Sequence, residues 1–515
     1  MNLTNDSRKL VSFYEKRKNI KRITVKPDDF RYIFNLVKSS YNSIETKGKI
    51  PNETKGKIPN AKIKTNRKKT QTSKTKKLGK VRLYLNNIDT CSFNESKKRL
   101  KNGDSLLAIF RLLAKENKDT LHKIYSEHNY PPQKQSIINR FLDDLSLDTK
   151  MTFDKCIEWV NLHGIELLRS IYIFHLQGKL PKKINDYLGE YPHTKGEFTS
   201  LDIQNEIQLG LKKNRKFDIQ INGTRLNLLV FSENDFKMNH KFLKRCFILD
   251  AIRNKKRKDI NLEIWLSNKK KNLPPKRELK YLGSKEVNSG CNTFNGIENR
   301  VSVWRKEELP KVLVHELVHS LGLEKYNGYK EVEDYIYSHF DVKRNNRFNL
   351  FENYVELIAN ILNICLTMIE NDKADLKTFN RLINLECQHC LFQVGKILNY
   401  YGYKDFGDFY KKDGILEENK TDRYLQKSNI FSYFVMRSMV IFNINDFIRL
   451  CIDKNKRNFL KQDFECKEFL KIMDKTLKEP SFENIINRNI VSNKQGNKDN
   501  LVYNNLRMTC IEVKI

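Results

Sequence analysis

The sequence predicts an α+β protein in which a strand-rich region leads into one buried helix and a helical region follows. Three observations carry this prediction. Residues 217–230 alternate apolar and polar side chains around an Asn-Gly pair. The segment Lys311–Leu321 is apolar around most of its circumference, as a buried helix is. From residue 350 to about 475 the apolar residues recur with helical spacing.

A basic segment separates the N-terminal residues 1–44 from the rest of the chain. A length of 515 residues exceeds the usual size of one hydrophobic core, so we expect several domains. Residues 1–44 form a short N-terminal segment. Residues 45–82 open with a tandem repeat, Glu45–Asn52 copied at Glu53–Asn60, and residues 47–82 hold 14 Lys and Arg against one acid. Such a composition cannot bury a core and predicts a disordered basic linker.

Three further regions follow this linker. Helical periodicity in stretches such as Ser105–Ala114 and Phe153–Val160 predicts a helical module over residues 95–190. Residues 195–475 are expected to form the main α+β domain. The polar residues 480–515 are expected to be a loosely held C-terminal tail.

Within the main domain the elements are predicted in order. The Asn222-Gly223 turn joins two alternating strands, and a helix is expected over residues 237–253. Residues 260–266 and 301–304 alternate as strands. The buried helix of residues 311–321 begins after Pro310, and it ends at a glycine, the residue that best terminates a helix.

This buried helix carries the most informative motif of the chain, His315-Glu316-Leu-Val-His319. Residues i and i+4 share one face of a helix, so both imidazoles can bind one Zn²⁺ ion. Glu316 stands beside them and can take a proton from a metal-bound water. A strand that leads directly into such a helix can lay a substrate backbone beside the metal. The pattern predicts a zinc-dependent hydrolase.

The helix resembles the active-site helix of the zincin metallopeptidases. In the metzincin branch the resemblance would require a third histidine where this chain has Lys325, and an ammonium group is a poor zinc ligand. The gluzincin branch, typified by thermolysin, takes its third ligand from a glutamate on a later helix. The Glu356-Leu-Ile-Ala359 segment is similar to the Glu-x-x-Ala pattern of that branch. The resemblance implies a gluzincin-type, zincin-like catalytic domain with one catalytic zinc ion.

Two glutamates compete for the third-ligand position, since Glu352 and Glu356 lie one turn apart on the same side of the predicted helix. We predict Glu356, because its neighbours are apolar and a lone carboxylate among them requires a metal. Ala359 would let the two helices approach. His339, 20 residues after His319, is a further alternative.

A second resemblance is broader. The segments Val287–Gly290, Trp304–Glu308 and Asn429–Phe434, together with the motif helix, are similar to uncharacterised proteins of large DNA viruses that are presumed metallopeptidases. Tyr433 lies in the last of these segments. We therefore predict Tyr433 as a second catalytic residue, which donates a hydrogen bond to the oxyanion formed during hydrolysis.

Composition indicates the compartment and the partners. The formal net charge of +34 and the basic residues 47–82 favour non-specific contact with nucleic acid. The ten cysteines are scattered, as in a reducing compartment, and the sequence has neither a signal core nor an 18-residue apolar run. We expect no membrane association and a location in the cytoplasm or nucleus of a host cell, or in a virion.

The predicted function is that of an intracellular zinc metalloendopeptidase, with protein or peptide substrates, in which His315, His319 and Glu356 bind the metal and Glu316 is the general base. One alternative is a DNA-associated protease that is anchored by the basic linker and uses His339 as its third ligand. The other is a non-catalytic protein that binds nucleic acid or builds a virion.

Overall fold

In the computed structural model of the protein the chain divides into two compact units, residues 1–56 with 209–515 and residues 57–208. The structure describes residues 1–17, 22–44, 104–115, 118–127, 129–147, 213–234, 236, 238–254, 259–275, 281–294, 299–342, 348–421, 423–454, 459–495 and 500–514, with ten single positions between 159 and 203. The predicted basic linker of residues 45–82 lies outside the described residues.

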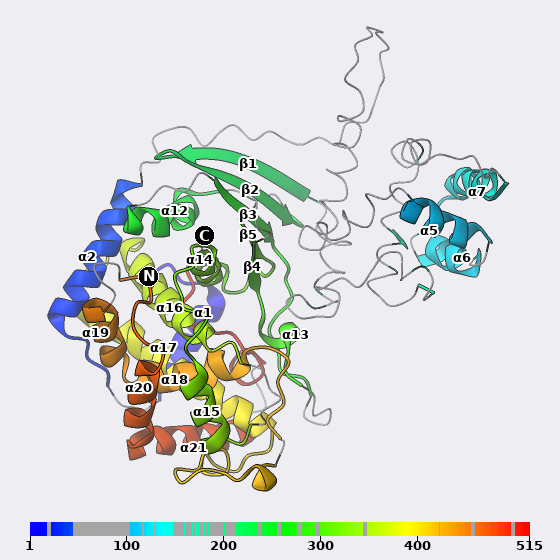
Figure 1. The fold of residues 1–515 in the computed structure, drawn as a ribbon. Helices are drawn as coiled ribbons and strands as arrows, with labels where there is room; N and C mark the ends of the chain where they lie inside the picture. The colour runs from blue at the N-terminus through cyan, green and yellow to red at the C-terminus, as the bar shows by residue number, and fades with distance from the viewer. Residues whose placement is uncertain are drawn as a thin grey trace. The chain divides into compact units, whose positions relative to one another are not determined.

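The larger unit is α+β, as predicted, and contains a mixed five-stranded sheet. Its strands run in the spatial order β1-β2-β3-β5-β4 (Figure 1), with β1 at Lys213–Ile221, β2 at Thr224–Ser232, β3 at Asp259–Trp265, β4 at Gly290–Phe294 and β5 at Asn299–Val303. Strands β2, β3 and β5 are parallel to one another. Strands β1 and β4 are antiparallel to their neighbours and end the sheet order.

The predicted hairpin is confirmed. Strands β1 and β2 pair in antiparallel register from Ile221 with Thr224 onwards, around Asn222 and Gly223. Both turn residues have positive φ angles, 51° and 83°, a conformation that asparagine and glycine adopt most easily. The side chain of Leu228 is fully buried. The alternation in the sequence therefore marks the face of the hairpin that packs on the core.

The helices of this unit lie beside and below the sheet in the view of Figure 1. They are α1 (Asn5–Glu15), α2 (Pro27–Ser43), α12 (His240–Arg253), α13 (Ser284–Val287), α14 (Leu309–Ser320), α15 (Lys330–His339), α16 (Phe351–Ile369), α17 (Leu376–Tyr400), α18 (Arg437–Phe442), α19 (Ile444–Lys454), α20 (Glu468–Leu477), α21 (Pro480–Gln495) and α22 (Asn500–Tyr503), with a 3₁₀ turn η3 at Glu417–Asn419 and a π-helical turn η4 at Phe431–Met436.

The motif helix α14 lies at the centre of this arrangement. It packs against β4 and β5 on one side and against α12 and α16 on others. Pro310 lies in its first turn, and Gly322 follows its end with a φ of +56°. Leu313 and Leu317 are fully buried. Because neighbours contact the helix on several faces, its polar side chains are held in fixed positions.

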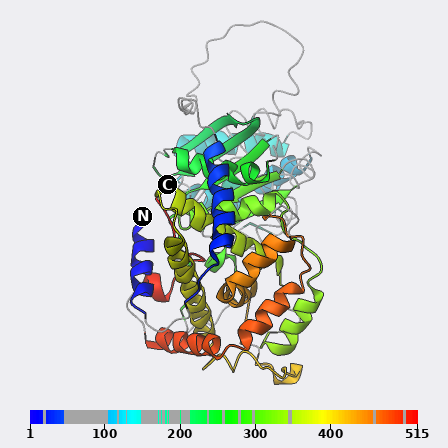
Figure 2. The same ribbon diagram turned by 90° about the vertical axis from the view of Figure 1, so that its left-hand side faces the viewer.

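Both ends of the chain belong to this unit, and the predicted loose tail of residues 480–515 is wrong. Figure 2 shows the N-terminal helices, in blue, on the same body as the C-terminal helices, in red. Residue Leu3 forms a β-bridge with Val513, and Ile511 is fully buried. The polar groups of residues 505–513 form buried hydrogen bonds to remote residues such as Glu307 and Glu308, which local composition does not reveal.

The smaller unit has a separate hydrophobic core, in agreement with the predicted helical module. Its described helices are α5 (Asp104–Lys115), α6 (Lys118–Glu127) and α7 (Pro132–Leu147). The rings of Phe110 and Phe141 meet edge to face, and Trp159 stacks on Phe141 with 3.7 Å between ring centroids. Most of the predicted helix over residues 153–160 lies outside the described residues.

No helix in the described part of the chain is both long and apolar enough to cross a membrane.

Candidate metal centre

Three side chains from two helices point their ligand atoms at one another. His315 and His319 come from α14, and Glu352 comes from the first turn of α16, which packs against it. The distances are 3.2 Å between the two Nε2 atoms, 3.3 Å from His315 Nε2 to Glu352 Oε2, and 3.2 Å from His319 Nε2 to the same oxygen. The three atoms therefore form a nearly equilateral triangle.

The size of this triangle fits a tetrahedral zinc site. Zinc binds imidazole nitrogen at about 2.0–2.1 Å, so two ligands of a tetrahedron stand about 3.3–3.4 Å apart. The observed edges of 3.2 to 3.3 Å are close to that value. Two histidines and one glutamate, with a fourth position left for water, is also a ligand set of catalytic zinc.

The opposite ring nitrogens face carboxylates. His319 Nδ1 lies 2.6 Å from Glu324 Oε1. His315 Nδ1 lies 2.8 Å from Glu356 Oε1, although the ring is not turned to make a well-directed hydrogen bond. A carboxylate at Nδ1 favours a proton on that nitrogen, which leaves the Nε2 lone pair for a metal. Two lone pairs and a carboxylate oxygen would then converge, an arrangement that a cation stabilises.

In the absence of a cation the same carboxylates favour protonated imidazoles. Burial lowers the pKa of His319, but Glu352 and Glu324 outweigh it and raise this pKa well above its usual value. For Glu352 burial acts in the opposite sense, and the two histidines bring its pKa down to about 2. The site thus attracts positive charge, whether protons or a metal ion.

The structure brings Glu352, and not Glu356 as predicted, beside the Nε2 atoms of His315 and His319. Glu356 is 1% exposed, and its carboxylate forms ion pairs with two buried cations, Lys311 and Arg437, the latter at 2.6 Å. It also faces the Nδ1 atom of His315, on the side of the ring away from the triangle. The sequence argument assumed that a carboxylate with apolar neighbours needs a metal. The structure instead supplies positive charge from Lys311, one turn before His315, and from Arg437 of α18.

Among the described residues, the other alternative, His339, is not part of the group that could hold a metal ion. This histidine ends α15, where its ring stacks on Tyr335 with 4.1 Å between centroids. Its Nδ1 atom lies 2.8 Å from Ser338 Oγ and 2.9 Å from the carbonyl oxygen of Tyr335. These contacts are those of a partly buried structural residue.

The side chain of Glu316, which belongs to α14, faces β4, the end strand of the sheet. It is 5% exposed, and Gly290 of β4 lies directly against its carboxylate. Burial raises the pKa of Glu316 to about 7, although His315 and His319 oppose this shift. A carboxylate with a pKa near neutrality is suited to accept a proton and to give it back.

Tyr433 lies close to the ring of His315, as its predicted role requires. Its ring lies 6.4 Å from that of His315, centroid to centroid. The side chain of Asn429 contacts both Tyr433 and Glu352. Its Nδ2 atom donates a hydrogen bond to Glu352 Oε1 at 3.3 Å and to the Tyr433 hydroxyl at 3.4 Å. Burial raises the pKa of Tyr433 well above its usual value, so the hydroxyl keeps its proton. Tyr433 lies in the π-helical turn η4, a distortion that is frequent at functional sites.

Sequence reasoning missed several residues that shape this centre. Glu324 follows His319 by five positions, and the helix end at Gly322 returns the chain so that its carboxylate reaches the ring. An acid shortly after the motif helix was a usable signal for Glu324. Lys311 stands one turn before His315 in the sequence, but no pattern indicated that it pairs with Glu356. Asn429 and Gly290 lay inside the segments of the viral resemblance, without an assigned role.

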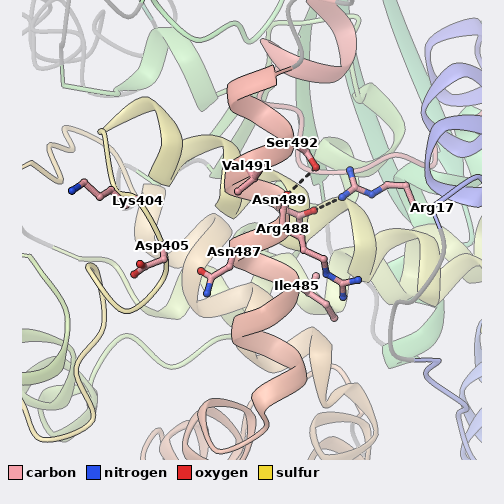
Figure 3. A pocket seen from close by; sticks show the side chains of 9 residues that line it. All are labelled: Arg17, Lys404, Asp405, Ile485, Asn487, Arg488, Asn489, Val491 and Ser492. Atoms are coloured by element: carbon pink, nitrogen blue, oxygen red, sulfur yellow. Dashed lines mark hydrogen bonds between the residues drawn. The ribbon is translucent and has the colours of Figure 1, made fainter.

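A concave surface lies along α21 and contains none of these residues. Figure 3 shows its lining of Arg17, Lys404, Asp405, Ile485, Asn487, Arg488, Asn489, Val491 and Ser492, and its volume is about 580 Å³. Arg17 donates a hydrogen bond to Asn489 Oδ1 at 2.6 Å. The lining offers positive charge, amides and a single carboxylate, Asp405, but no histidine, cysteine or glutamate. It is therefore not a candidate for the same chemistry.

A comparison with known proteins shows a similarity to a viral protein. No protein-family model matches the chain, and no solved structure matches it. A stretch of 185 residues is 24% identical to an uncharacterised protein of Acanthamoeba polyphaga mimivirus. The match covers 34% of this chain and 45% of the relative, so the chain spans less than half of the relative's length. The similarity is to a viral protein and identifies neither a family nor an activity.

Proposed function

We propose that the protein is a zinc-dependent metallopeptidase of the gluzincin type, in which His315, His319 and Glu352 hold one Zn²⁺ ion and Glu316 is the general base. Its substrates are proteins or peptides. One observation carries this proposal: three ligand atoms form a triangle with edges of 3.2 to 3.3 Å, while both histidines turn their other nitrogens to carboxylates. Such paired contacts orient metal-binding histidines in zinc enzymes.

The order of elements agrees with this proposal. Strands, a helix, further strands and then the motif helix match the α+β upper lobe of a zincin, and the helices after α16 match a helical lower lobe. The structural basis is therefore the combination of fold and site, because fold alone does not imply function.

Each residue of the centre then has a distinct task. A bound zinc ion would polarise the peptide carbonyl and lower the pKa of a water molecule bound to it. With the metal bound, Glu316 would be the general base, the residue placed to hold the proton between the attacking water and the leaving amine. The hydroxyl of Tyr433, which remains protonated, donates a hydrogen bond to the carbonyl oxygen as negative charge develops there. Glu324 keeps the His319 imidazole in the orientation that binds metal, and Glu356 places a second carboxylate beside His315 Nδ1.

The sheet offers a place for the substrate backbone. Strand β4 ends the strand order, and its first residue, Gly290, touches the Glu316 carboxylate. A peptide aligned with β4 would therefore pass the general base. Extended peptides commonly bind by adding to the edge of a sheet. Main-chain hydrogen bonds to β4 would then fix the position of the scissile bond along that strand.

Elemental analysis and a peptide library test the proposal together. We expect close to one zinc ion per purified full-length chain and cleavage of library peptides detected by mass spectrometry. Glu316→Gln should keep the zinc and abolish cleavage, because the amide cannot accept a proton. The matched control Glu331→Gln changes an exposed glutamate of α15 and should cleave as the wild type does. A chain without zinc, or equal cleavage by Glu316→Gln, would refute the proposal.

The alternatives have less support. A DNA-associated protease would need His339 as its third ligand, but this histidine is engaged with Tyr335 and Ser338. A non-catalytic protein that binds nucleic acid or builds a virion would not need Glu316 beside the triangle. Nucleic-acid contact through residues 47–82 stays a prediction, because these residues lie outside the described part of the chain.

A further inference from the structure

The concave surface along α21, called the α21 groove below, carries two arginines on one side. Figure 3 shows Arg17, which follows the end of α1, and Arg488 of α21 on the same side of the helix. Lys404 and Asp405 lie on the other side, where their opposite charges cancel. The net positive charge of the groove therefore comes from the two arginines.

The side chain of Arg17 is half-buried and held in place. One nitrogen donates a hydrogen bond to Asn489 Oδ1 at 2.6 Å. The guanidinium carbon lies 5.4 Å from the centroid of the Phe13 ring and 5.0 Å from that of Phe392. A guanidinium has five N–H donors, and this hydrogen bond uses one of them. Arg17 is thus a fixed cation with donors left for a ligand.

The described residues give Arg17 a like charge as a neighbour and no carboxylate in an ion pair. Glu15, the nearest acid in the sequence, pairs with Arg381 instead. Burial lowers the pKa of Arg17 from its usual value, and the positive charge of Arg488 acts in the same direction. An anion that contacts both guanidinium groups would therefore be stabilised by both and would relieve their repulsion.

The rest of the α21 groove suits an organic group more than a bare ion. Its volume of about 580 Å³ lies within the range of about 300–1,000 Å³ that is usual for small-molecule pockets. Ile485 and Val491 offer apolar surface, and Val491 is 47% exposed. Asn487 Oδ1 accepts from the Phe406 amide at 2.6 Å, which orients the side-chain amide of Asn487. An anionic end and an apolar part are thus both accommodated.

We propose that the α21 groove binds a phosphate ester of nucleotide size, with the phosphate between Arg17 and Arg488 and the organic part against Ile485 and Val491. Phosphate fits because its oxygens match the forked N–H groups of arginine. The ligand is a nucleoside phosphate, either free or at the end of a nucleic-acid strand. The site contains no residue of the metal centre, so this binding function is independent of the proposed peptidase activity.

Calorimetric titration of the full-length protein with adenosine 5′-monophosphate tests the site. We expect Arg488→Gln to weaken binding by about 10-fold or more, because a hydrogen-bonded charge contact to the phosphate is lost. Arg488 is exposed, so this variant should fold as the wild type does. The matched control Arg31→Gln removes the same charge from an exposed arginine of α2 and should leave the affinity unchanged.

The organic part of the ligand is tested with inorganic phosphate as a second probe. The wild type should bind adenosine 5′-monophosphate about 10-fold or more tightly than inorganic phosphate. Val491→Ser, which shortens an exposed apolar side chain, should weaken binding of the nucleotide and leave that of inorganic phosphate unchanged. The dinucleotides TpT and 5′-phosphorylated pTpT distinguish the two sources. If pTpT loses affinity in Arg488→Gln as the mononucleotide does, while TpT does not, the ligand includes a strand end; if neither responds, it is a free nucleotide.

Three results would overturn the proposal. Equal losses in Arg488→Gln and Arg31→Gln would mean that binding follows net charge alone and that the α21 groove is not a site. Equal affinities for inorganic phosphate and the nucleotide would remove the organic part. A wild type that binds no nucleotide would remove the site itself. Residues 47–82 are the same in every variant, so their charge does not affect these comparisons. Zinc content should be equal in all the variants, and none of these results bears on the metallopeptidase proposal.

Discussion

Gly290 of β4 lies so close to Glu316 of α14 that a β-carbon on the glycine would stand 2.6 Å from the carboxylate oxygen Oε1 and 2.7 Å from Cγ. No side chain fits into that space without displacing the glutamate. Glycine at this position therefore fixes the distance between the end strand of the sheet and the general base. A residue far from it in the sequence thus sets the position of Glu316.

We predict that Gly290→Ala binds zinc but is nearly inactive. The added methyl group would push the Glu316 carboxylate aside by roughly an ångström, and a displacement of that size in a reacting group can reduce the rate about 100-fold. Zinc content, measured beside kcat, should stay near the wild-type value because no ligand is touched.

Gly283→Ala is the matched control for this prediction. A β-carbon there would meet its nearest neighbour, Lys427 Cβ, at 3.5 Å, which is an ordinary contact. This variant should keep most of the activity. Equal activity in Gly290→Ala and the wild type would show that Glu316 is not held by this contact.

The two glutamates of α16 should respond differently to mutation. Glu352→Ala removes a ligand atom of the triangle, so the protein should fold and lose most of its zinc. Glu356→Ala leaves Lys311 and Arg437 buried with no carboxylate between them, at a cost of about 3–5 kcal/mol in the free energy of unfolding. Denaturant unfolding with and without a chelator measures both effects.

A chelator should lower the stability of the Glu356→Ala protein further if it still binds metal, since zinc stabilises only the folded state. The assignment returns to Glu356 if Glu352→Ala keeps its zinc while Glu356→Ala loses zinc without loss of stability.

How far the sequence leads to this site depends on how local each contact is. The pair His315 and His319 follows from helix geometry, because residues four apart share a face whatever the rest of the fold is. The choice between Glu352 and Glu356 depends on Arg437, 81 positions beyond Glu356, which pairs with it in the core. No local pattern indicates such a contact, so the helix was predictable from the sequence but the glutamate that faces the histidines was not.

The fold shows the same limit. The hairpin at Asn222-Gly223 was predictable because turn and alternation lie within a few residues of each other. The last residues looked like a loose tail because their partners are remote. Glu386 of α17 accepts hydrogen bonds from the amides of Cys510 and Ile511, each at 3.0 Å. Those amides are satisfied by a carboxylate more than 120 positions away in the chain.

Acid should weaken the fold through His389. This histidine is buried and neutral: Nδ1 accepts from the Tyr14 hydroxyl at 2.9 Å, and Nε2 donates to the Arg507 carbonyl at 2.9 Å. Burial, with the positive charges of Lys396 and Arg437, holds its pKa well below the usual value. Below about pH 6.5 the unfolded chain therefore binds a proton that the folded chain does not.

The sign follows from that difference. The contribution of His389 is fully present above about pH 6.5 and falls by about 1.4 kcal/mol per pH unit below it. His389→Gln cannot titrate, so its free energy of unfolding between pH 6.5 and 5 should fall less steeply than that of the wild type by about this slope. Parallel pH profiles for the two proteins would contradict a neutral, buried His389.

Glu308 joins the start of the motif helix to the C-terminal segment of the chain. It is fully buried and has a positive φ of 63°, an unfavourable angle for a residue with a β-carbon. Its Oε1 atom accepts from the amides of Met508 and Thr509, each at 2.6 Å, and its Oε2 atom pairs with Lys271 at 2.6 Å. The cost of the backbone angle is offset by these contacts.

Glu308→Ala should therefore lower the free energy of unfolding by about 3–5 kcal/mol, because it leaves the Lys271 ammonium and two amides buried without their acceptor. Asp474→Ala is the control, since it breaks an exposed ion pair with Lys478 and should cost less than about 1 kcal/mol. Denaturant unfolding of both variants compares these costs. Similar values for the two would mean that the C-terminal segment does not hold α14 in place. A large difference, with zinc bound more weakly by Glu308→Ala, would mean that residues 505–513 help to keep His315 and His319 in register with Glu352.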